Sequence, residues 1–139
     1  MSRVILIAAD KPLPLSDHQE LRTKHSSLPS GETFVIDYEA GFKVDEHAYY
    51  RPAVDALAYP MNPFQYELDF EIIEKDLRAL RCYLPEQFSP GESLELWSVW
   101  VGDEPHPALV RCSKTPKELD LALLEQLSYA DQLCITITI

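Results

Sequence analysis

Glycine is scarce in this sequence, which has four glycines among its 139 residues. No G-x-x-x-x-G-K-S/T or G-x-G-x-x-G stretch occurs, so few places allow a phosphate group to approach the backbone closely. The patterns G-x-S-x-G and H-E-x-x-H are absent as well. These absences disfavour the common nucleotide-binding, hydrolase and zinc-protease designs.

Cysteines and long apolar runs are also few. The cysteines, Cys82, Cys112 and Cys134, are odd in number and widely spaced, which is unlike a secreted disulfide framework. The apolar stretch over residues 4–9 is too short for a signal peptide or for a membrane span. No other segment approaches the length of a span, so we expect a cytoplasmic protein that does not enter membranes.

Basic residues are outnumbered, with 12 Lys and Arg against 23 Asp and Glu, and the formal net charge is −11. An acidic surface repels phosphate backbones, so direct nucleic-acid binding is not expected. The same charge favours encounters with a basic protein. The composition, 46% hydrophobic and 25% charged, is that of a folded chain, and its length suits one domain over residues 1–139.

Hydrophobic periodicity predicts the secondary structure. Strands are expected over residues 3–9, 34–39, 42–45, 64–70, 93–101, 108–112 and 133–139. Helices are expected over residues 16–24, 52–58, 73–84 and 115–127. Ser16 and Gln19 have the spacing of a capping box for the first helix, and Gly41 suits a hairpin turn between residues 34–39 and 42–45.

This order of elements predicts an α+β domain, or a mixed α/β one. We expect a single, mostly antiparallel or mixed sheet of about five or six strands, with two main helices packed on one face. Residues 93–101 are apolar at alternating positions on both faces, so this strand is expected near the centre. The face without helices would be wet and carry Asp37, Glu67, Asp69 and Glu95.

A partner-binding surface is the main site hypothesis. Tyr49, Tyr50 and Arg51 follow one another, and tyrosine, arginine and tryptophan are favoured at the centres of protein interfaces. We therefore predict a surface made from Tyr49, Tyr50, Arg51 and Trp97 together with the acidic residues Asp37, Glu67, Asp69 and Glu95. The simpler alternative is that the aromatic side chains fill the core and the carboxylates keep one sheet face in solution.

Residues 111–117 form the one basic stretch of an acidic chain, and they lead into a predicted helix N-terminus, where free amides favour anions. The basic neighbours are expected to lower the pKa of the Cys112 thiol. Arg111, Cys112 and Lys114 are thus candidates for a small-anion site or a reactive thiol. The alternative is a charged loop before a capped helix, with Cys112 as a small apolar strand residue.

Histidine and acidic residues cluster at residues 45–47 and again at residues 103–106. Such side chains hold divalent metals, but neighbours in sequence diverge, so a site needs both clusters, or Asp17 and His18, to meet in space. Solvated loop charges explain the clusters more simply. We assign no metal, cofactor or catalytic residue from the sequence.

The leading functional hypothesis is a small acidic protein-interaction domain without catalytic activity that binds a basic partner. An immunity-type antagonist of a toxin or nuclease is one version. A self-associating structural homodimer, with Trp97 or the C-terminal strand at its interface, is an alternative. A second alternative is a small enzyme or small-molecule binder, whose site would use His47, His106 or Cys112, with Tyr50 and Arg51 as companions.

Overall fold

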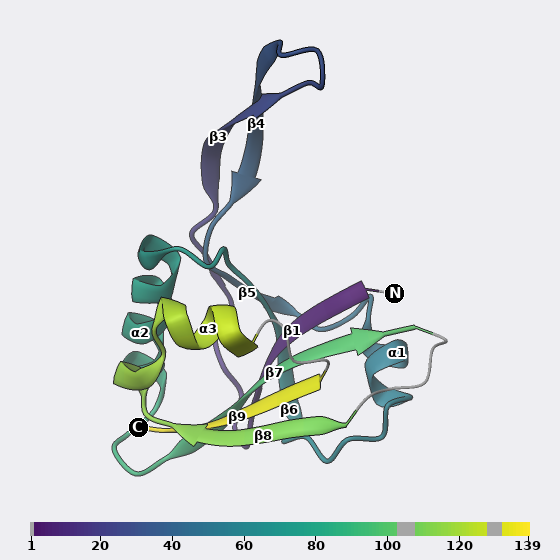
Figure 1. Cartoon of the computed structure of the whole chain (residues 1–139). Coiled ribbons are helices and arrows are strands. Elements are labelled where there is room, and N and C mark those ends of the chain that lie inside the picture. The colour runs from purple at the N-terminus through teal and green to yellow at the C-terminus, as the bar shows by residue number, and fades with distance from the viewer. Residues whose placement is uncertain (1, 103–107, 128–131) are drawn as a thin grey trace.

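A computed structural model describes residues 2–102, 108–127 and 132–139 of the chain. Within these residues, seven strands form one mixed sheet in the order β2-β5-β6-β1-β7-β9-β8, and two further strands, β3 and β4, pair only with each other (Figure 1). The strands are β1 (Ser2–Ala9), β2 (Ser16–Asp17), β3 (Glu20–Ser27), β4 (Thr33–Ala40), β5 (Lys43–Glu46), β6 (Phe64–Asp69), β7 (Ser93–Val101), β8 (Leu109–Lys114) and β9 (Gln132–Thr138). In the large sheet, only β8 and β9 run parallel.

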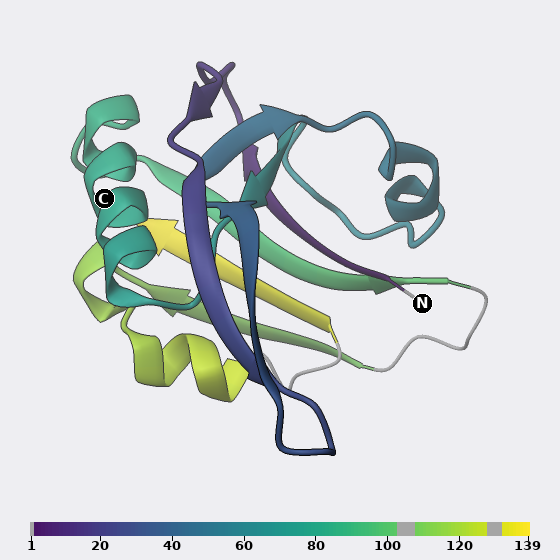
Figure 2. The ribbon, with the colours of Figure 1, turned by 90° about the horizontal axis from the view of Figure 1, so that it is seen from above.

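The helices lie on both faces of the large sheet. Helices α2 (Glu74–Gln87) and α3 (Leu121–Leu127) cover one face, while the short α1 (Arg51–Asp55) lies over the other, as Figure 2 shows. The predicted single α+β domain is therefore confirmed. The two expected main helices match only roughly, because α3 has seven residues and a third helix lies on the other face. The sheet is larger than the five or six strands expected, and no described helix is long and apolar enough to cross a membrane.

Apolar side chains are buried on both faces of the sheet because successive side chains of its central strands point to opposite faces. The predicted central position of residues 93–101 is confirmed, since β7 lies between β1 and β9. The cluster under α2 and α3 includes Ile7, Leu80, Leu96 and Ile135, and the cluster under α1 includes Leu6, Val54, Trp97 and Val99. The second face is thus partly core, and the prediction of a wet face was wrong there.

The helix expected over residues 16–24 was wrong. These residues form β2 and β3, and β3 pairs with β4 along its full length of eight residues. The amide of Gln19 donates to the Asp17 carboxylate at 2.9 Å, a local turn that competes with a helical cap. The ladder with β4 supplies backbone hydrogen bonds that a capping box alone does not outweigh.

The hairpin expected across Ala40 and Gly41 was wrong as well. β4 pairs with β3, and β5 pairs with β2 and β6, so the residues on either side of Gly41 do not face each other. Asp17 is opposite Lys43 and Glu20 is opposite Ala40, with no residue inserted between these pairs. Residues 16–27 and 33–46 therefore form one antiparallel ribbon, which starts in the sheet and then leaves it. We call its outer part, β3, β4 and their turn, the arm.

The boundaries of two helices differ from those expected from the sequence. Pro85 does not end α2, which continues to Gln87. The capping box of Thr115 and Glu118 does form, but it begins a single 3-10 turn (Pro116–Glu118) that is separate from α3. Leu119, between the 3-10 turn and α3, is buried in the core cluster under α2 and α3.

The ribbon bends at Gly41, where β4 ends and β5 has not begun. Gly41 has a φ of 142°, and a Cβ atom at this position would lie 2.6 Å from the carbonyl oxygen of His18. Backbone of the two strands approaches closely here, and the amide of His18 donates to the Phe42 carbonyl at 2.9 Å. Only glycine combines this φ with this contact.

We predict that Gly41→Ala destabilises the protein by about 2 kcal/mol more than Gly91→Ala. Gly91 is the matched control because its φ of 90° is also unfavourable for alanine, whereas a Cβ there meets no atom within 4 Å. Urea denaturation of both variants measures the difference. Equal losses would show that the contact with His18 relaxes at no cost.

The arm is fixed to the body at its base. Arg22 of β3 donates to the Asp76 carboxylate at 2.6 and 2.9 Å and to Glu71 at 2.7 Å. Tyr38, opposite Arg22 on β4, also hydrogen-bonds Glu71, at 3.2 Å. Asp76 is buried at the start of α2, and the hydrogen bonds from Arg22 hold the pKa of its carboxyl below the ordinary value. The arm thus leaves the body in a direction set by a charged pair.

A carboxyl whose pKa is lower in the folded state stabilises the fold above its ordinary pKa, and that stability is lost as the pH falls through the folded value. For Asp76 the loss begins below about pH 4. We predict that Asp76→Asn lowers the free energy of unfolding by about 3 kcal/mol at pH 7. The variant also has a flatter decline in acid, which denaturant titrations between about pH 2 and pH 7 measure. Parallel curves for the variant and the parent would contradict the role of Asp76.

Candidate functional site

A cavity of about 590 Å³ gathers four of the predicted partner-binding residues. Tyr49 and Tyr50 line it from the loop before α1, and Glu67 and Asp69 line it from β6. Asp45 of β5 also lines it, directly opposite Glu67 in the ladder. We call this feature the acidic cavity.

The strand register explains why these charges meet. β5 and β6 are neighbours, so Asp45 faces Glu67 and Lys43 faces Asp69 on one face of the sheet. Like charges directly opposite each other on a sheet are unfavourable unless a cation joins them. Lys43 reaches Asp45 at 3.4 Å, whereas the closest basic group to Glu67 is the His47 ring, with Nδ1 at 3.5 Å. Arg3 also lines the cavity, so two cations, Arg3 and Lys43, stand against four carboxylates, those of Asp45, Glu46, Glu67 and Asp69.

The two tyrosines give this cavity an aromatic border. Their rings meet edge to face with centroids 4.9 Å apart, and Tyr49 is 85% exposed. Tyr50 is half-buried against the core cluster under α1, and it precedes Arg51 and Pro52, which begin that helix. Proline suits the first turn of a helix because it needs no amide there. Tyr50 is thus held in place while Tyr49 remains accessible.

His47 lies beside this cavity and is buried. Burial lowers the pKa of its imidazole, with the contact to Glu67 acting in the opposite direction. Neither ring nitrogen has a hydrogen-bond partner, and the buried Gln65 side-chain oxygen also lacks one. Both residues line a neighbouring cavity of about 310 Å³, in which Arg51 donates from Nε to the His47 carbonyl at 2.8 Å. Arg51 therefore lies next to the acidic cavity, and its Nε–H group is used in a hydrogen bond to the backbone.

The sequence had suggested Trp97 and Glu95 as parts of an accessible surface, but Trp97 is buried and Glu95 is half-buried and hydrogen-bonded within the fold. Trp97 is fully buried, and its ring stacks with Tyr59 at a centroid distance of 5.7 Å. Glu95 accepts hydrogen bonds from the indole of Trp97 at 3.2 Å and from the amide of Asn62 at 2.8 Å. These contacts hold the chain after α1 against β7. The other candidate for a homodimer interface, the C-terminal strand β9, lies between β7 and β8 and has no free edge in the described part of the sheet.

Asp37 does not lie on the large sheet, where the sequence had placed it. It is on β4 in the arm, where its carboxylate accepts a hydrogen bond from the Thr23 hydroxyl at 2.9 Å. The prediction that Asp37 shares the face of the large sheet with the other acids was therefore wrong.

Arg111, Cys112 and Lys114 do not form one site. Adjacent strand residues point to opposite faces, so the Arg111 guanidinium lies over the Trp97 ring, 5.5 Å from its centroid, while Cys112 packs against the core under α2 and α3. Burial raises the pKa of the Cys112 thiol, and the opposing effect of Lys114 is smaller. The expected lowering of this pKa was wrong. The helix that follows is a single 3-10 turn, and the amide of its N-cap residue, Thr115, donates to the Glu118 carboxylate at 3.1 Å.

The two candidate clusters of histidine and acidic residues cannot be compared in space. Residues 103–106 lie outside the described residues, so that half of the hypothesis has no structural counterpart. Among the residues that the structure does describe, no group of three or more His, Cys, Asp and Glu side chains is placed to hold a metal ion.

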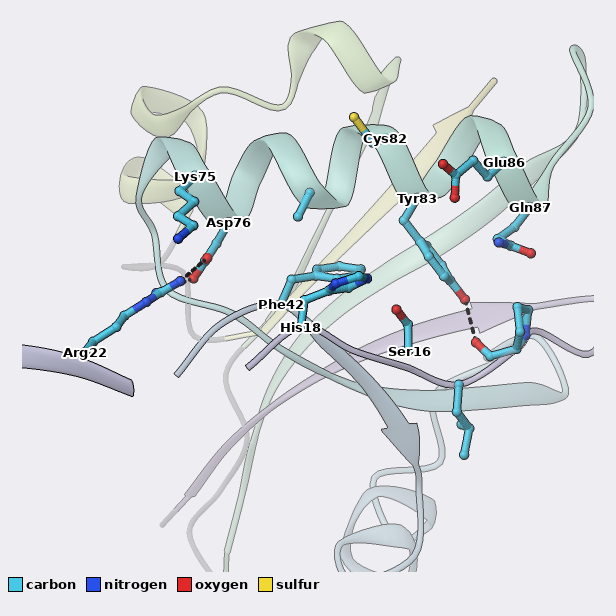
Figure 3. Close-up of a pocket in the computed structure, with 13 residues that line it drawn as sticks. Ser16, His18, Arg22, Phe42, Lys75, Asp76, Cys82, Tyr83, Glu86 and Gln87 are labelled. Carbon is cyan, nitrogen blue, oxygen red and sulfur yellow. Dashed lines mark hydrogen bonds and ion pairs between the residues drawn. The ribbon is translucent and has the colours of Figure 1, made fainter. Parts of the chain in front are cut away.

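A groove between α2 and the root of the arm was missed by the sequence reasoning (Figure 3). It has a volume of about 490 Å³, and Phe42 and Tyr83 form its floor with ring centroids 5.4 Å apart. The Tyr83 hydroxyl donates to the Pro14 carbonyl at 3.0 Å, and burial raises the pKa of Tyr83 to about 12. No motif marks the groove, because its walls come from residues far apart in the chain.

The basic side chains that line this groove, Arg22 and Lys75, are already paired with carboxylates. Arg22 uses four of its five N–H donors on Glu20, Glu71 and Asp76. Lys75 is 2.6 Å from Glu20, and Figure 3 shows Lys75 beside the Arg22–Asp76 pair. The groove therefore offers little to an anionic ligand, and these charges instead connect the arm to α2.

Comparison of the chain with protein-family models, with curated protein sequences and with solved structures found no significant match. The function is therefore argued from the arrangement of the chain's own residues.

We predict that Cys82 is the only described cysteine that reacts with a thiol reagent such as iodoacetamide, at about pH 7.5, as fast as a free cysteine. It is exposed, whereas burial raises the pKa of Cys112 and brings that of the buried Cys134 to about 12. Cys82→Ser should remove the fast phase, and Cys112→Ser should leave it unchanged. A fast phase that disappears only with Cys112→Ser would restore the reactive-thiol hypothesis.

Proposed function

We propose that this protein is a non-catalytic interaction domain that binds a basic partner protein through the acidic cavity. An antagonist that blocks a basic toxin or nuclease is one form of this function. The observation that carries the proposal is the meeting of Asp45, Glu67 and Asp69 with Tyr49 and Tyr50 around one cavity. The three cysteines are unpaired in the fold, which supports a reducing compartment such as the cytoplasm.

The chemistry of the cavity suits a lysine or arginine side chain. A guanidinium or ammonium group pairs with carboxylates and is attracted to the face of an aromatic ring, and both are present here. The cation would separate the opposed Asp45 and Glu67, which have no shared basic neighbour. The net charge of −11 adds a long-range attraction that speeds encounter with a basic surface.

The test uses a short acetylated peptide with one arginine and one lysine between glycines, titrated into the full chain at low salt. We expect amide signals of the loop with Tyr49 and Tyr50 to shift in NMR spectra, and the affinity to fall as salt is added. The double variant Glu67→Gln/Asp69→Asn should weaken binding by about fivefold, which corresponds to about 1 kcal/mol.

The matched control is the double variant Asp10→Asn/Glu86→Gln, which removes the same charge from exposed positions outside the cavity. It should bind the peptide as the parent does, within about twofold, because only the long-range field has changed. Equal weakening by both double variants would show that binding depends on net charge alone. That result, or the absence of binding at low salt, would overturn the proposed function.

A further inference from the structure

The arm carries apolar side chains that the body does not cover. Leu21 is 74% exposed and Val35 is 57% exposed on one face of the arm, and Phe34 and Ile36 are exposed on the other. Figure 1 shows β3 and β4 projecting away from the large sheet and its helices. A two-stranded ribbon has no third layer to bury such side chains and is marginally stable by itself in water. Their exposure therefore points to a surface that another chain covers.

The two faces of the arm differ in what already occupies them. The face with Arg22 and Tyr38 is joined to α2 at its base. The opposite face points away from these contacts, and we call it the outward face. It carries Leu21, Thr23, Val35, Asp37 and Glu39, since alternate residues of paired strands share a face.

The outward face is acidic between its apolar side chains. Asp37 accepts one hydrogen bond, from Thr23, and Glu39 makes no ion pair or hydrogen bond within the described part of the chain. Glu39 lies directly opposite Leu21, and Asp37 lies one step farther along the same face. Two apolar and two acidic side chains thus lie close together on this face, with His25 opposite Val35. They complement an extended segment that carries both apolar and basic side chains on one of its sides.

This face continues into the acidic cavity. The register of the ribbon is constant through the bend, so Asp37 and Glu39 share a ladder face with Lys43 and Asp45. Gln19, opposite the bend, reaches Asp69 in the cavity at 3.1 Å. One acidic surface therefore runs from the cavity, past Gly41, onto the arm.

We propose that the outward face of the arm binds an extended basic segment of the partner protein. The proposal rests on the proposed function for the basic nature of that partner. Leu21 and Val35 contact apolar side chains of the segment, and Asp37 and Glu39 pair with its basic ones. A second copy of this chain is a poorer occupant, because each copy brings a net charge of −11.

The test uses an acetylated peptide in which threonine occupies every second position and lysine and valine alternate at the positions between, so that one side of the extended peptide carries both. The control probe has glutamate in place of lysine. Binding to the full chain at low salt is measured by fluorescence anisotropy, and the bound surface is located from amide shifts in NMR spectra. We expect the basic peptide to shift signals of β3 and β4, and the acidic peptide to leave them unchanged.

Two double variants of the arm separate the apolar contribution to peptide binding from the charged one. Leu21→Ser/Val35→Ser removes the apolar contacts, and Asp37→Asn/Glu39→Gln removes the charges; each should weaken binding by about tenfold or more, as expected for central contacts. NMR spectra that retain the dispersion of the body confirm that each variant is folded. The control variant Asp10→Asn/Glu86→Gln should bind this peptide as the parent does, within about threefold, because it removes the same charge from exposed positions outside both the arm and the cavity.

The outcomes separate the two proposals. Weakening by the cavity variant Glu67→Gln/Asp69→Asn alone would overturn the docking role of the arm and leave the proposed function standing. Binding without shifts in β3 and β4 would overturn it as well. Concentration-dependent dimerisation of the parent that Leu21→Ser/Val35→Ser abolishes would make a second copy the occupant, and would also overturn the proposal.

Discussion

The pairing of Arg22 with Asp76 is the contact on which the geometry of the outer half of the molecule depends. It is the main charged link between a ribbon with no core of its own and a helix that is packed on the large sheet. Burying such a pair costs desolvation energy, so its net effect on stability is modest, but a bidentate geometry fixes direction well. Glu71 and Tyr38 complete the same cluster. The arm is therefore presented at a set angle, which reduces the entropy that a partner must remove on binding.

The constant register of the ribbon links this anchor to the acidic cavity. Residues 33–46 act as one strand that changes partner at Gly41, from β3 outside the sheet to β2 and β6 within it. Because a shift by one residue would invert every side chain, the same register places Asp45 over the cavity and Asp37 on the outward face. The two acidic regions are thus parts of one surface, although the sequence separates them with the bend.

Much of the large sheet could be predicted because its signals are local. The alternation in β7 shows two buried faces, and the apolar run of β1 shows a covered strand. The ribbon could not be predicted in this way. Residues 20–27 are mostly polar and lack a clear period, and their strand conformation depends on pairing with residues 33–40. Tyr49 and Glu67 were found by residue type, but their meeting depends on the pairing of β5 with β6. Trp97 has the same residue type as an interface anchor and fills the core instead.

The strand edges of the large sheet can be compared with those of the arm. An unpaired edge invites pairing with other chains, and proteins blunt it with proline, charge or local turns. The β2 edge of the large sheet follows Pro14, and Asp17 there captures a backbone amide. The β8 edge carries Arg111 and Lys114. Neither β3 nor β4 contains proline, but both carry charges, with Arg22 and Lys24 on β3 and Asp37 and Glu39 on β4. The arm therefore differs from the large sheet in its uncovered faces and not in its edges, because Leu21 and Val35 remain exposed beside Asp37 and Glu39.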